Sequence, residues 1–381
     1  MPIAKQVPTI APFGHPFYVM AKPVGSSCNL SCSYCYFLTK AKGRMDERLL
    51  EEFIRQNIEA QTQPEVLFTW HGGEPLLLPL SYYARAIELQ QKYARGRHID
   101  NCLQTNGTLL TDEWCAFFRE HNFLIGISID GPEWMHNANR QQFDATLRGI
   151  RLLQKHGVMW NAMATVNSTN GSHPTEFYRF FKELGCEYLQ FTPVVETRSS
   201  GTQAAFQGNA DNVSREHFSV TPETVSPQQW GDFIIGVFDE WVKEDVGRVF
   251  VQLFEATLAN WVGVEPGVCS LSKGCGLSPA LQPDGALYCC DHFVYDDYKL
   301  GNIHEQTLTQ MVYGERQQAF SRLKMEALSQ RCRRCDYLFA CNGECLRNRF
   351  LPDHENYLCE GYCRYFEHVT PFMNDMAKRL T

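Results

Sequence analysis

Cys28, Cys32 and Cys35 lie at spacings of four and three residues, with no fourth cysteine or histidine close by. A structural zinc ion takes four protein ligands in a closed tetrahedron, so three thiols make an incomplete zinc site. A four-iron, four-sulfur cluster bound by three thiolates keeps one iron free for a ligand that is not protein. The spacing therefore predicts a cluster with an open iron, as catalysis needs. The alternative, three neighbouring core cysteines, is disfavoured by the glycine-flanked loop around them.

The other cysteines are also grouped rather than scattered. Of the 16 cysteines in the chain, four lie between residues 269 and 290 and six between residues 332 and 363. Only Cys102, Cys115 and Cys186 are isolated. Cytosolic thiols are kept reduced, so disulfides would not explain these groups in a cytoplasmic protein. Grouped cysteines in a reducing compartment indicate metal, and the open first site indicates iron.

A second set of candidate residues lies where predicted strands end. Gly72-Gly73-Glu74-Pro75 follows the predicted strand 66–70, and Ser128 and Asp130 stand at the end of another. Glycines at such a position permit close approach of the backbone to a ligand. A plain turn would explain the Gly-Gly-Glu-Pro segment equally well, turn capping would explain Ser128 and Asp130, and a solvated surface charge would explain Arg140. Their common place beside an open cluster favours the functional interpretation.

The elements that must position these residues alternate along the first half of the chain. The predicted strands are 17–22, 66–70, 99–104, 123–129, 158–166 and 187–194, and the predicted helices between them are 46–61, 82–93, 112–121, 143–156 and 174–184. Alternation of this kind predicts parallel strands with right-handed crossovers. In β/α barrels the site is built at the carboxyl ends of the strands. Six units instead of eight predict an α/β fold with a partial, open (β/α)6 barrel.

The composition changes along the second half of the chain. Residues 195–226 are rich in Ser, Gly, Asn and Gln and are expected to form a long loop or insertion. Helices are predicted at 227–243 and at 251–262, and cysteines then become frequent. We therefore expect two domains, a barrel domain at 1–250 with its core at 17–195, and a cysteine-rich domain at 251–381 that ends in a helix.

Bulk properties exclude several classes of partner. The formal net charge is −8, whereas nucleic-acid binders show basic patches. No apolar run approaches the ~18–20 residues that a membrane helix needs. The first residues lack the charged-then-apolar pattern of a signal peptide. We expect a cytoplasmic protein without nucleic-acid or membrane partners.

The cysteine loop carries a family resemblance. Cys28-x3-Cys32-x2-Cys35, with Tyr34 inside it and Gly-Gly-Glu-Pro after it, resembles the radical S-adenosylmethionine superfamily. The resemblance implies that the free iron binds the amino and carboxylate groups of the methionine moiety. One electron then cleaves the sulfonium to give a 5′-deoxyadenosyl radical, so that the cofactor carries the radical chemistry and the protein positions it.

The later cysteines resemble the SPASM domain of peptide-modifying radical enzymes. That domain holds two auxiliary four-iron clusters, which would give this chain three clusters in all. By the family pattern, one auxiliary cluster takes Cys269, Cys275, Cys290 and Cys345, and the other takes Cys332, Cys335, Cys341 and Cys359. A pair of zinc knuckles is the alternative. Cys289 and Cys363 are left over, and Cys289 beside Cys290 leaves the ligand at that position open.

Within this group the chain is similar to the anaerobic sulfatase-maturating enzymes from Lys22 to about Phe366. The stretches that carry the similarity are Leu103-Gln-Thr-Asn-Gly-Thr-Leu, Gly126-Ile-Ser-Ile-Asp-Gly-Pro, Leu189-Gln-Phe, Gly285-Ala-Leu-Tyr-Cys-Cys-Asp291 and Leu300-Gly-Asn-Ile. The resemblance implies S-adenosylmethionine contacts at Tyr34, Gly72, Gly73, Glu74, Ser128, Arg140 and Val195. It also implies that Asp291 is the general base. The alternative for Asp291 is a turn residue that hydrogen-bonds the neighbouring cluster loop.

The activity that this resemblance implies is oxidation of a cysteine or serine to Cα-formylglycine, within a Cys/Ser-x-Pro-x-Arg segment of an unfolded or nascent sulfatase. The adenosyl radical would take a hydrogen from Cβ, Asp291 would accept the proton, and the auxiliary clusters would carry away the electron. An electron donor such as flavodoxin or ferredoxin is implied. The rival functions are another SPASM maturase that forms a thioether or carbon–carbon crosslink, and a non-catalytic iron-sulfur or zinc protein.

Overall fold

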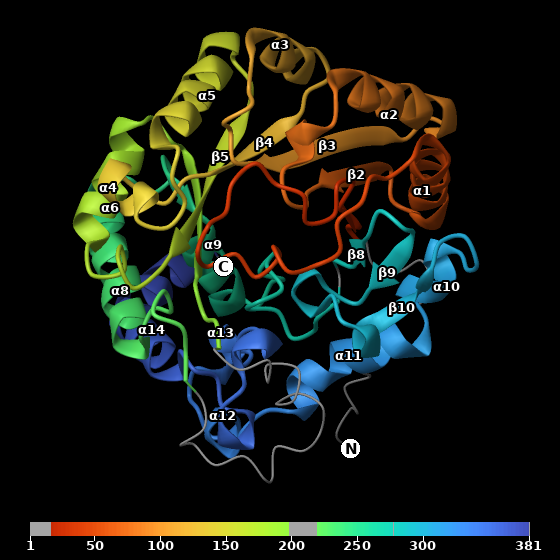
Figure 1. Cartoon of the computed structure of the whole chain (residues 1–381). Helices are drawn as coiled ribbons and strands as arrows, with labels where there is room; N and C mark the ends of the chain where they lie inside the picture. The colour runs from red at the N-terminus through yellow and green to blue at the C-terminus, as the bar shows by residue number, and fades with distance from the viewer. Residues whose placement is uncertain (1–16, 198–218, 277, 381) are drawn as a thin grey trace.

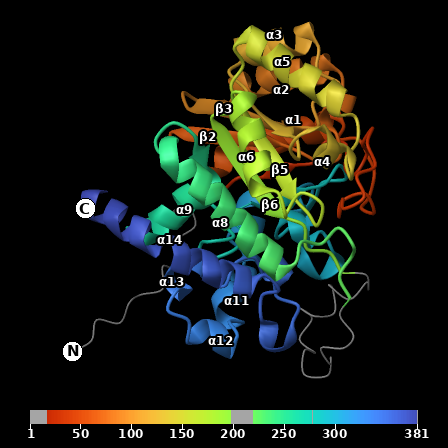
Figure 2. The same ribbon diagram turned by 90° about the vertical axis from the view of Figure 1, so that its left-hand side faces the viewer.

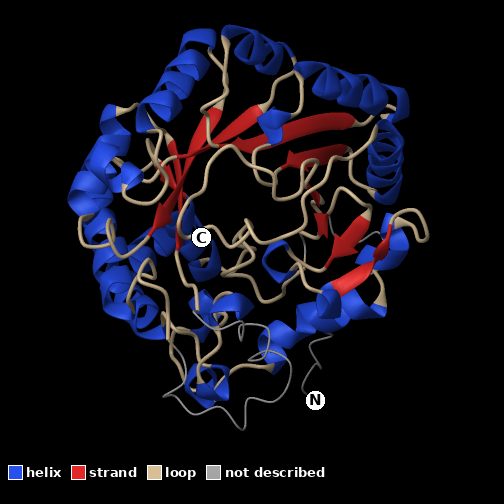
Figure 3. Ribbon diagram, in the orientation of Figure 1, coloured by secondary structure: helices blue, strands red, loops and turns tan. Residues whose placement is uncertain are grey.

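A single curved sheet forms the centre of the molecule in the computed structural model, which describes residues 17–197, 219–276 and 278–380. Ten described strands belong to this sheet. The sheet lines the inside of the molecule, and most helices cover its outside (Figures 1 and 3). The candidate residues therefore lie on loops that are held by a continuous scaffold.

Seven strands run parallel to one another, as the alternating pattern predicts. They are β1 (Met20–Ala21), β2 (Glu65–Trp70), β3 (His98–Thr105), β4 (Leu124–Ser128), β5 (Trp160–Val166), β6 (Tyr188–Pro193) and β7 (Phe250–Val251). The six predicted strands are confirmed, and β7 adds a short seventh. Neighbouring strands follow chain order from β1 to β7, and β7 ends the sheet on that side, so the barrel is open.

Helices separate these strands and pack on the outer face of the sheet (Figure 1). They are α1 (Glu47–Ala60), η1 (Pro75–Leu77), α2 (Leu80–Tyr93), α3 (Asp112–Glu120), α4 (Glu133–Asn137), α5 (Phe143–His156), α6 (Pro174–Glu183), α8 (Pro227–Glu244) and α9 (Gln252–Trp261). The seven helices predicted up to residue 262 are confirmed, and the short α4 and η1 were not predicted.

Side-chain caps explain where several helices begin. The Asp46 carboxylate accepts a hydrogen bond from the Leu49 amide at 2.8 Å, and Thr111 caps α3 in the same way. At α8 the Ser226 hydroxyl accepts from the Gln229 amide at 3.1 Å, and the Gln229 side chain accepts from the Ser226 amide at 3.2 Å. Such caps satisfy amides that have no partner within the helix, and each contributes about 1 kcal/mol.

The second part of the chain extends the same sheet. Its strands are β8 (Ala280–Leu281), β9 (Ala286–Tyr288) and β10 (Lys299–Asn302). β8 pairs in parallel with β1, and β9 pairs antiparallel with both β8 and β10. β1 is thus flanked on one side by the barrel and on the other by the cysteine-rich part. The sheet continues across the domain boundary that composition predicts, and that boundary stays a prediction.

Short helices carry most of the cysteine-rich part. They are η4 (Asp291–Phe293), η5 (Asp296–Tyr298), α10 (Leu308–Val312), α11 (Glu315–Glu326), α12 (Gln330–Arg333), α13 (Leu338–Cys341), η6 (Leu346–Asn348), η7 (Pro352–His354) and the long C-terminal α14 (Cys359–Leu380). α14 confirms the expected C-terminal helix, and it packs against α8 of the barrel (Figure 2).

Two glycines allow α8 and α14 to cross closely. A Cβ on Gly231 would lie 2.9 Å from the Gly361 Cα, and a Cβ on Gly361 would lie 2.4 Å from the Pro227 carbonyl oxygen. No side chain larger than hydrogen fits between two backbones at these distances. The crossing therefore fixes α14, and the cysteines at its start, relative to the barrel.

Two sequence expectations differ from the structure or are only partly covered by it. The insertion expected at 195–226 lies mostly outside the described residues, which resume at residue 219. β1 is shorter than the predicted strand 17–22, because only Met20 and Ala21 pair with both neighbours. None of the described helices is both long and apolar enough to span a membrane.

Candidate functional site

The Gly-Gly-Glu segment after β2 forms backbone hydrogen bonds with the start of the cysteine loop. The Gly73 amide donates to the Gly25 carbonyl at 2.8 Å, and the Glu74 amide donates to the Ser27 carbonyl at 2.8 Å. A Cβ on Gly73 would stand 2.0 Å from the Ser27 carbonyl oxygen. Gly73 is therefore required for this contact, and the contact holds the cysteine loop at the end of the barrel strands.

The Glu74 carboxylate is buried and already bonded within the protein. It accepts hydrogen bonds from the Leu76 amide at 3.0 Å, the Thr105 hydroxyl at 2.7 Å and the Asn106 amide at 2.8 Å. Buried carboxylates need such partners to remain stable. Glu74 therefore joins the ends of β2 and β3, and its predicted contact with S-adenosylmethionine stays a prediction.

The three thiols of the cysteine loop lie within electrostatic reach of one another. The Cys32 thiol interacts with those of Cys28 and Cys35, and burial raises the pKa of Cys32 to about 11, against the opposing effect of Arg140. Cys28 Sγ accepts from the Leu30 amide at 3.4 Å and from Asn106 Nδ2 at 3.9 Å. Hydrogen bonds to sulfur of this kind are those that tune an iron-sulfur cluster.

Tyr34 and Arg140 meet at the buried Asp130 carboxylate. Tyr34 donates its hydroxyl to Asp130, Arg140 Nε lies 3.2 Å from Asp130 Oδ2, and the Thr165 amide donates to Oδ1 at 2.9 Å. The Arg140 guanidinium also lies 5.5 Å from the Tyr34 ring centroid. The cysteine loop is thereby linked to the ends of β4 and β5. The sequence analysis favoured a place for Asp130 beside the open cluster over turn capping, but it did not predict the bonds from Asp130 to Tyr34 and Arg140.

The other predicted cofactor contacts lie on the same end of the sheet. The Ser128 hydroxyl accepts from Gln104 Nε2 at 2.8 Å. Val195 is buried directly after β6, and its neighbour Val194 packs with Cys32 and Tyr34. Together with Gly72 at the end of β2, these residues surround the cysteine loop, although their contacts with a cofactor stay predictions.

Asp291 reaches this loop from the cysteine-rich part of the chain. Its carboxylate forms an ion pair with the fully buried Lys22 at the end of β1 and accepts the Tyr36 hydroxyl. Lys22 Nζ also lies 3.2 Å from His71 Nδ1, which accepts the Gly72 amide at 2.7 Å. Residues from β1, the end of β2, the cysteine loop and η4 therefore meet at one carboxylate.

The charges around Asp291 keep it ionised. Burial opposes ionisation, but the Lys22 ammonium holds the pKa of Asp291 well below its usual range. Burial and the Lys22 ammonium lower the pKa of His71 to about 4. At neutral pH the site therefore presents an ionised carboxylate beside an uncharged imidazole.

A second ion pair lies next to this network. Arg347 pairs with Glu196, and its guanidinium stands 4.6 Å from the Tyr36 ring centroid. The Tyr36 and His292 rings meet edge to face at 5.2 Å. The sequence analysis missed Tyr36, His71 and Arg347. The place of Tyr36 directly after Cys35 was a usable signal, whereas nothing local marks Arg347.

The first predicted auxiliary set comes together in the fold. The Cys290 thiol lies in electrostatic reach of Cys269 and Cys345, and the Cys345 thiol in reach of Cys269 and Cys275. These four cysteines come from three separate stretches of chain. Burial raises the pKa of each free thiol, and a bound metal would instead keep it deprotonated.

Two buried cations accompany this set without a carboxylate partner. Lys324 donates to the Cys269 carbonyl at 2.5 Å and the Ser270 carbonyl at 2.8 Å, and Arg349 donates only to backbone carbonyls. Both side chains are 0% exposed, and neither forms an ion pair with a carboxylate in the described part of the chain. Buried charges are normally paired. The buried Glu344 carboxylate also lies in electrostatic reach of these thiols, so one positive charge is in excess among Lys324, Arg349 and Glu344, and an anionic cluster with four thiolates fits it.

The second predicted set also comes together. A fifth thiol, that of Cys363, lies among its four thiols. Cys332 lies in electrostatic reach of Cys335, Cys341 and Cys359. Across the described ranges, no three or more His, Cys, Asp or Glu side chains form a group that could hold a single metal ion. A zinc ion holds its thiolates close together, with Zn–S bonds of about 2.3 Å. A four-iron cluster is larger than one ion and holds its thiolates further apart.

Replacing Lys324 by glutamine is expected to lower the reduction potential of the neighbouring auxiliary cluster, by on the order of 50 mV, because net charge is a main determinant of cluster potential. A redox titration followed by electron paramagnetic resonance measures the shift. Lys273→Gln is the matched control, since Lys273 is exposed and lies between Cys269 and Cys275. An unchanged potential in the Lys324 variant, or the same shift in the control, would contradict the assignment.

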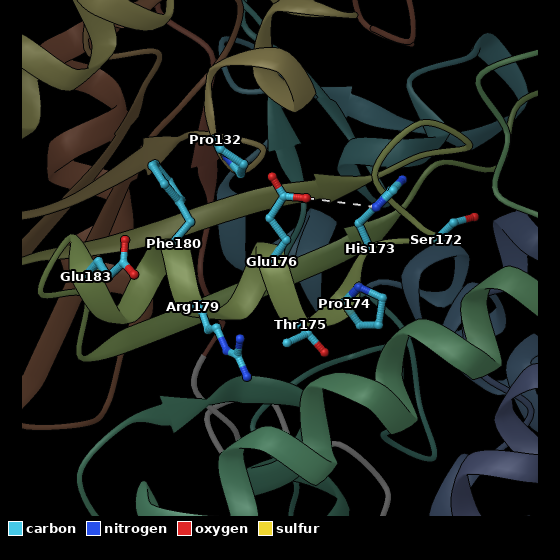
Figure 4. A pocket seen from close by; sticks show the side chains of 9 residues that line it. All are labelled: Pro132, Ser172, His173, Pro174, Thr175, Glu176, Arg179, Phe180 and Glu183. Carbon is cyan, nitrogen blue, oxygen red and sulfur yellow. Dashed lines mark ion pairs between the residues drawn. The ribbon is translucent and has the colours of Figure 1, made fainter.

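A hollow of the described surface lies away from the predicted site residues. It measures ≈610 Å³ and is lined at the start of α6 by residues that include Pro132, His173 and Arg179 (Figure 4). His173 Nδ1 lies 4.0 Å from Glu176 Oε2 within it. None of the predicted site residues lines this hollow, so it has no part in the function argued below.

Family models match both parts of the chain. The model of the Radical SAM superfamily matches residues 23–181, and that of an iron-sulfur cluster-binding domain matches residues 276–336. The chain is 53% identical to the serine-type anaerobic sulfatase-maturating enzyme of Bacteroides thetaiotaomicron, over 98% of this chain and 94% of that one. It is 37% identical to the serine-type enzyme of Klebsiella aerogenes, over 95% and 88%.

A solved structure matches almost the whole fold. It is anSMEcpe with bound AdoMet and a Cp18Cys peptide, at 28% sequence identity and a TM-score of 0.85, covering 96% of this chain and 100% of that chain. This likeness confirms the expected α/β fold with a parallel sheet of the radical S-adenosylmethionine type, followed by the iron-sulfur domain.

Proposed function

Because the chain belongs to the anaerobic sulfatase-maturating enzymes, we propose that it oxidises a serine or cysteine side chain of a sulfatase to Cα-formylglycine. The observation that carries this proposal is the meeting of Asp291 with Lys22 and Tyr36. It places a carboxylate from the iron-sulfur domain directly beside the loop that holds Cys28, Cys32 and Cys35.

The chain binds S-adenosylmethionine and iron-sulfur clusters, as its two family matches imply. We infer three four-iron, four-sulfur clusters, with about twelve irons per chain. Cys28, Cys32 and Cys35 would hold the open one. The two auxiliary clusters would be held by Cys269, Cys275, Cys290 and Cys345, and by Cys332, Cys335, Cys341 and Cys359. The unpaired Lys324 and Arg349 support the first auxiliary set.

The barrel residues would bind and orient the cofactor. When bound and reduced, the open cluster with S-adenosylmethionine supplies the 5′-deoxyadenosyl radical that takes a hydrogen atom from the substrate Cβ. Tyr34 and Arg140, which are held by Asp130, would form one wall of the cofactor site. Gly72 and Gly73 would offer backbone without side-chain obstruction. Ser128 and Val195 would complete the cavity at the ends of β4 and β6.

Asp291 would remove the proton that oxidation releases. Loss of a hydrogen atom from Cβ leaves a carbon radical, which must lose one electron and one proton to become an aldehyde or a thioaldehyde. The radical makes that proton acidic enough for a carboxylate to accept it. Lys22 and Tyr36 hold the Asp291 carboxylate in position. For cysteine, hydrolysis of the thioaldehyde then releases hydrogen sulfide.

The released electron would leave by way of the auxiliary clusters to a partner outside the chain. Asp291 directly follows Cys290, so the proton acceptor and one cluster ligand are adjacent in the chain. The partners proposed are an unfolded or nascent sulfatase segment and a one-electron donor such as flavodoxin or ferredoxin.

We expect serine to be a substrate, since the matched enzymes of Bacteroides thetaiotaomicron and of two Klebsiella species, at 37% identity or more, are serine-type. Reconstituted enzyme, reductant and S-adenosylmethionine would be incubated without oxygen with two peptides that differ only in Ser or Cys before x-Pro-x-Arg. Mass spectrometry should show formylglycine from the serine peptide, with a matching amount of 5′-deoxyadenosine. Conversion of the cysteine peptide alone would contradict the serine assignment. Crosslinked peptide, or no peptide change, would contradict the proposed function.

A further inference from the structure

Helix α14 brings a second cysteine to the auxiliary site at which Cys359 is the expected ligand. Cys359 is the first residue of the helix, and Cys363 follows one helical turn later. Residues four apart on a helix lie on the same face, one above the other. Cys359 and Cys363 therefore point to the same neighbouring segment.

The orientation of that face is fixed by the crossing of α8 and α14. Gly361 lies midway between the two cysteines in sequence, which places it on the opposite side of the helix. That side is in backbone contact with Gly231 and Pro227 of α8. Tyr362 and Tyr365 are also buried against the barrel side, where Tyr362 meets Trp230 and Tyr365 meets Phe238 of α8. The helix can therefore not rotate to remove either thiol from the site.

Cys363 touches two of the four expected ligands. Its thiol is in hydrogen-bond contact with the thiols of both Cys359 and Cys335. It also lies in electrostatic reach of Cys341. Cys363 is thus within the group of thiols, and its place in the fold is as suitable for binding the cluster as that of Cys359.

We propose that Cys359 and Cys363 are interchangeable fourth ligands of the auxiliary cluster whose other ligands are Cys332, Cys335 and Cys341. The inference rests on the proposed function, which assigns a cluster to this site. Exchange would need no redox change: the Cys363 thiol would lose its proton as its sulfur bonds to iron, the bond from iron to Cys359 would break, and that proton would pass to the released Cys359 sulfur. Either ligand leaves the charge of the cluster unchanged.

The test uses full-length protein reconstituted with iron and sulfide, in five forms beside the wild type. These are Cys359→Ala, Cys363→Ala, the double variant, Cys332→Ala and Cys289→Ala. Iron is counted, and the reduced clusters are identified by electron paramagnetic resonance. Cys289 is the control, because it is the other cysteine of the cysteine-rich part left without an expected cluster, and the thiol in electrostatic reach of Cys269 and Cys345 is that of Cys290. Cys332 is the positive comparison, because the contacts of the spare Cys363 thiol are with Cys359 and Cys335, so Cys363 is placed to replace Cys359 and not Cys332.

We expect about twelve irons in the wild type, in both single variants of α14 and in Cys289→Ala, and about eight in the double variant and in Cys332→Ala. The spectrum of the second auxiliary cluster should change in only one of the two variants Cys359→Ala and Cys363→Ala. That variant is the one that removes the residue bound in the wild type, so that the other cysteine takes its place. Loss of four irons in either single variant would overturn the inference. Cys359→Ser, which keeps the start of α14, repeats the measurement if the alanine variant does not fold.

The iron content of the wild type tests the proposed number of clusters separately from the exchange of Cys359 and Cys363. A wild-type content of about eight irons would overturn the proposed cluster content, and the inference with it. A wild-type content of about twelve, with equal losses in Cys359→Ala and the double variant, would overturn the inference alone and leave Cys359 as the fixed ligand.

Discussion

The Cys35→Ala variant is expected to lose all conversion of peptide to formylglycine and all reductive cleavage of S-adenosylmethionine. Two thiolates at positions 28 and 32 do not hold a four-iron cluster stably, since the motif supplies only three ligands to begin with. Iron content should fall from about twelve to about eight atoms per chain. Production of 5′-deoxyadenosine, measured by chromatography, should fall to background.

Cys115→Ala is the matched control for that variant. Cys115 is fully buried in α3, away from each predicted cluster set, so its replacement removes a thiol without removing a ligand. The control should keep its iron and its activity. If Cys35→Ala kept the wild-type iron content and still formed 5′-deoxyadenosine at the wild-type rate, the assignment of the open cluster to this loop would be wrong.

Replacement of Asp291 by asparagine is expected to slow formylglycine formation by about 10²- to 10⁴-fold, the usual contribution of a general base. Asparagine has nearly the same size but accepts no proton. Hydrogen abstraction comes before proton transfer, so 5′-deoxyadenosine should still form. The signature is therefore an excess of 5′-deoxyadenosine over oxidised peptide, with both measured in the same reaction.

The interpretation of that variant needs a check on the fold. Asparagine leaves the Lys22 ammonium buried without its ion pair, which destabilises a protein by about 3–5 kcal/mol when the pair is fully buried. Iron content and thermal unfolding separate this effect from loss of the base. Asp296→Asn, at an exposed carboxylate near by, should behave as the wild type. Unchanged turnover in Asp291→Asn would remove Asp291 from its proposed role.

Much of the barrel could be predicted because its signals are local. Helix α1 begins at an Asp46 cap and carries Leu49, Leu50 and Phe53 on its buried side, and periodicity shows both features. The strands of the parallel sheet end in Gly-Gly-Glu-Pro and Ser-x-Asp-Gly, so their carboxyl ends were marked as well. The sequence gives no comparable signal for β8, a strand of two residues whose pairing with β1 depends on a contact between distant parts of the chain.

The candidate site also contains residues that local sequence signals predict and residues that only contacts between distant parts of the chain reveal. The cysteine sets could be proposed from spacing and resemblance, and Asp291 from the resemblance. The partners of Asp291 could not be predicted from the sequence. Lys22 and Tyr36 approach it only when the second part of the chain packs against the first. Cys363 was set aside although its spacing from Cys359 is helical, because the family pattern takes its eight auxiliary ligands from other cysteines.

The pairing of β8 with β1 has a consequence for synthesis of the protein. Until the ribosome has made the last third of the chain, β1 has backbone partners on one side only. An unpaired strand edge is a template for pairing with other chains. A truncated barrel that ends at residue 250 would leave this edge open beside the cysteine loop. We therefore expect truncated products to aggregate, so the barrel depends on its C-terminal partner for solubility as well as for chemistry.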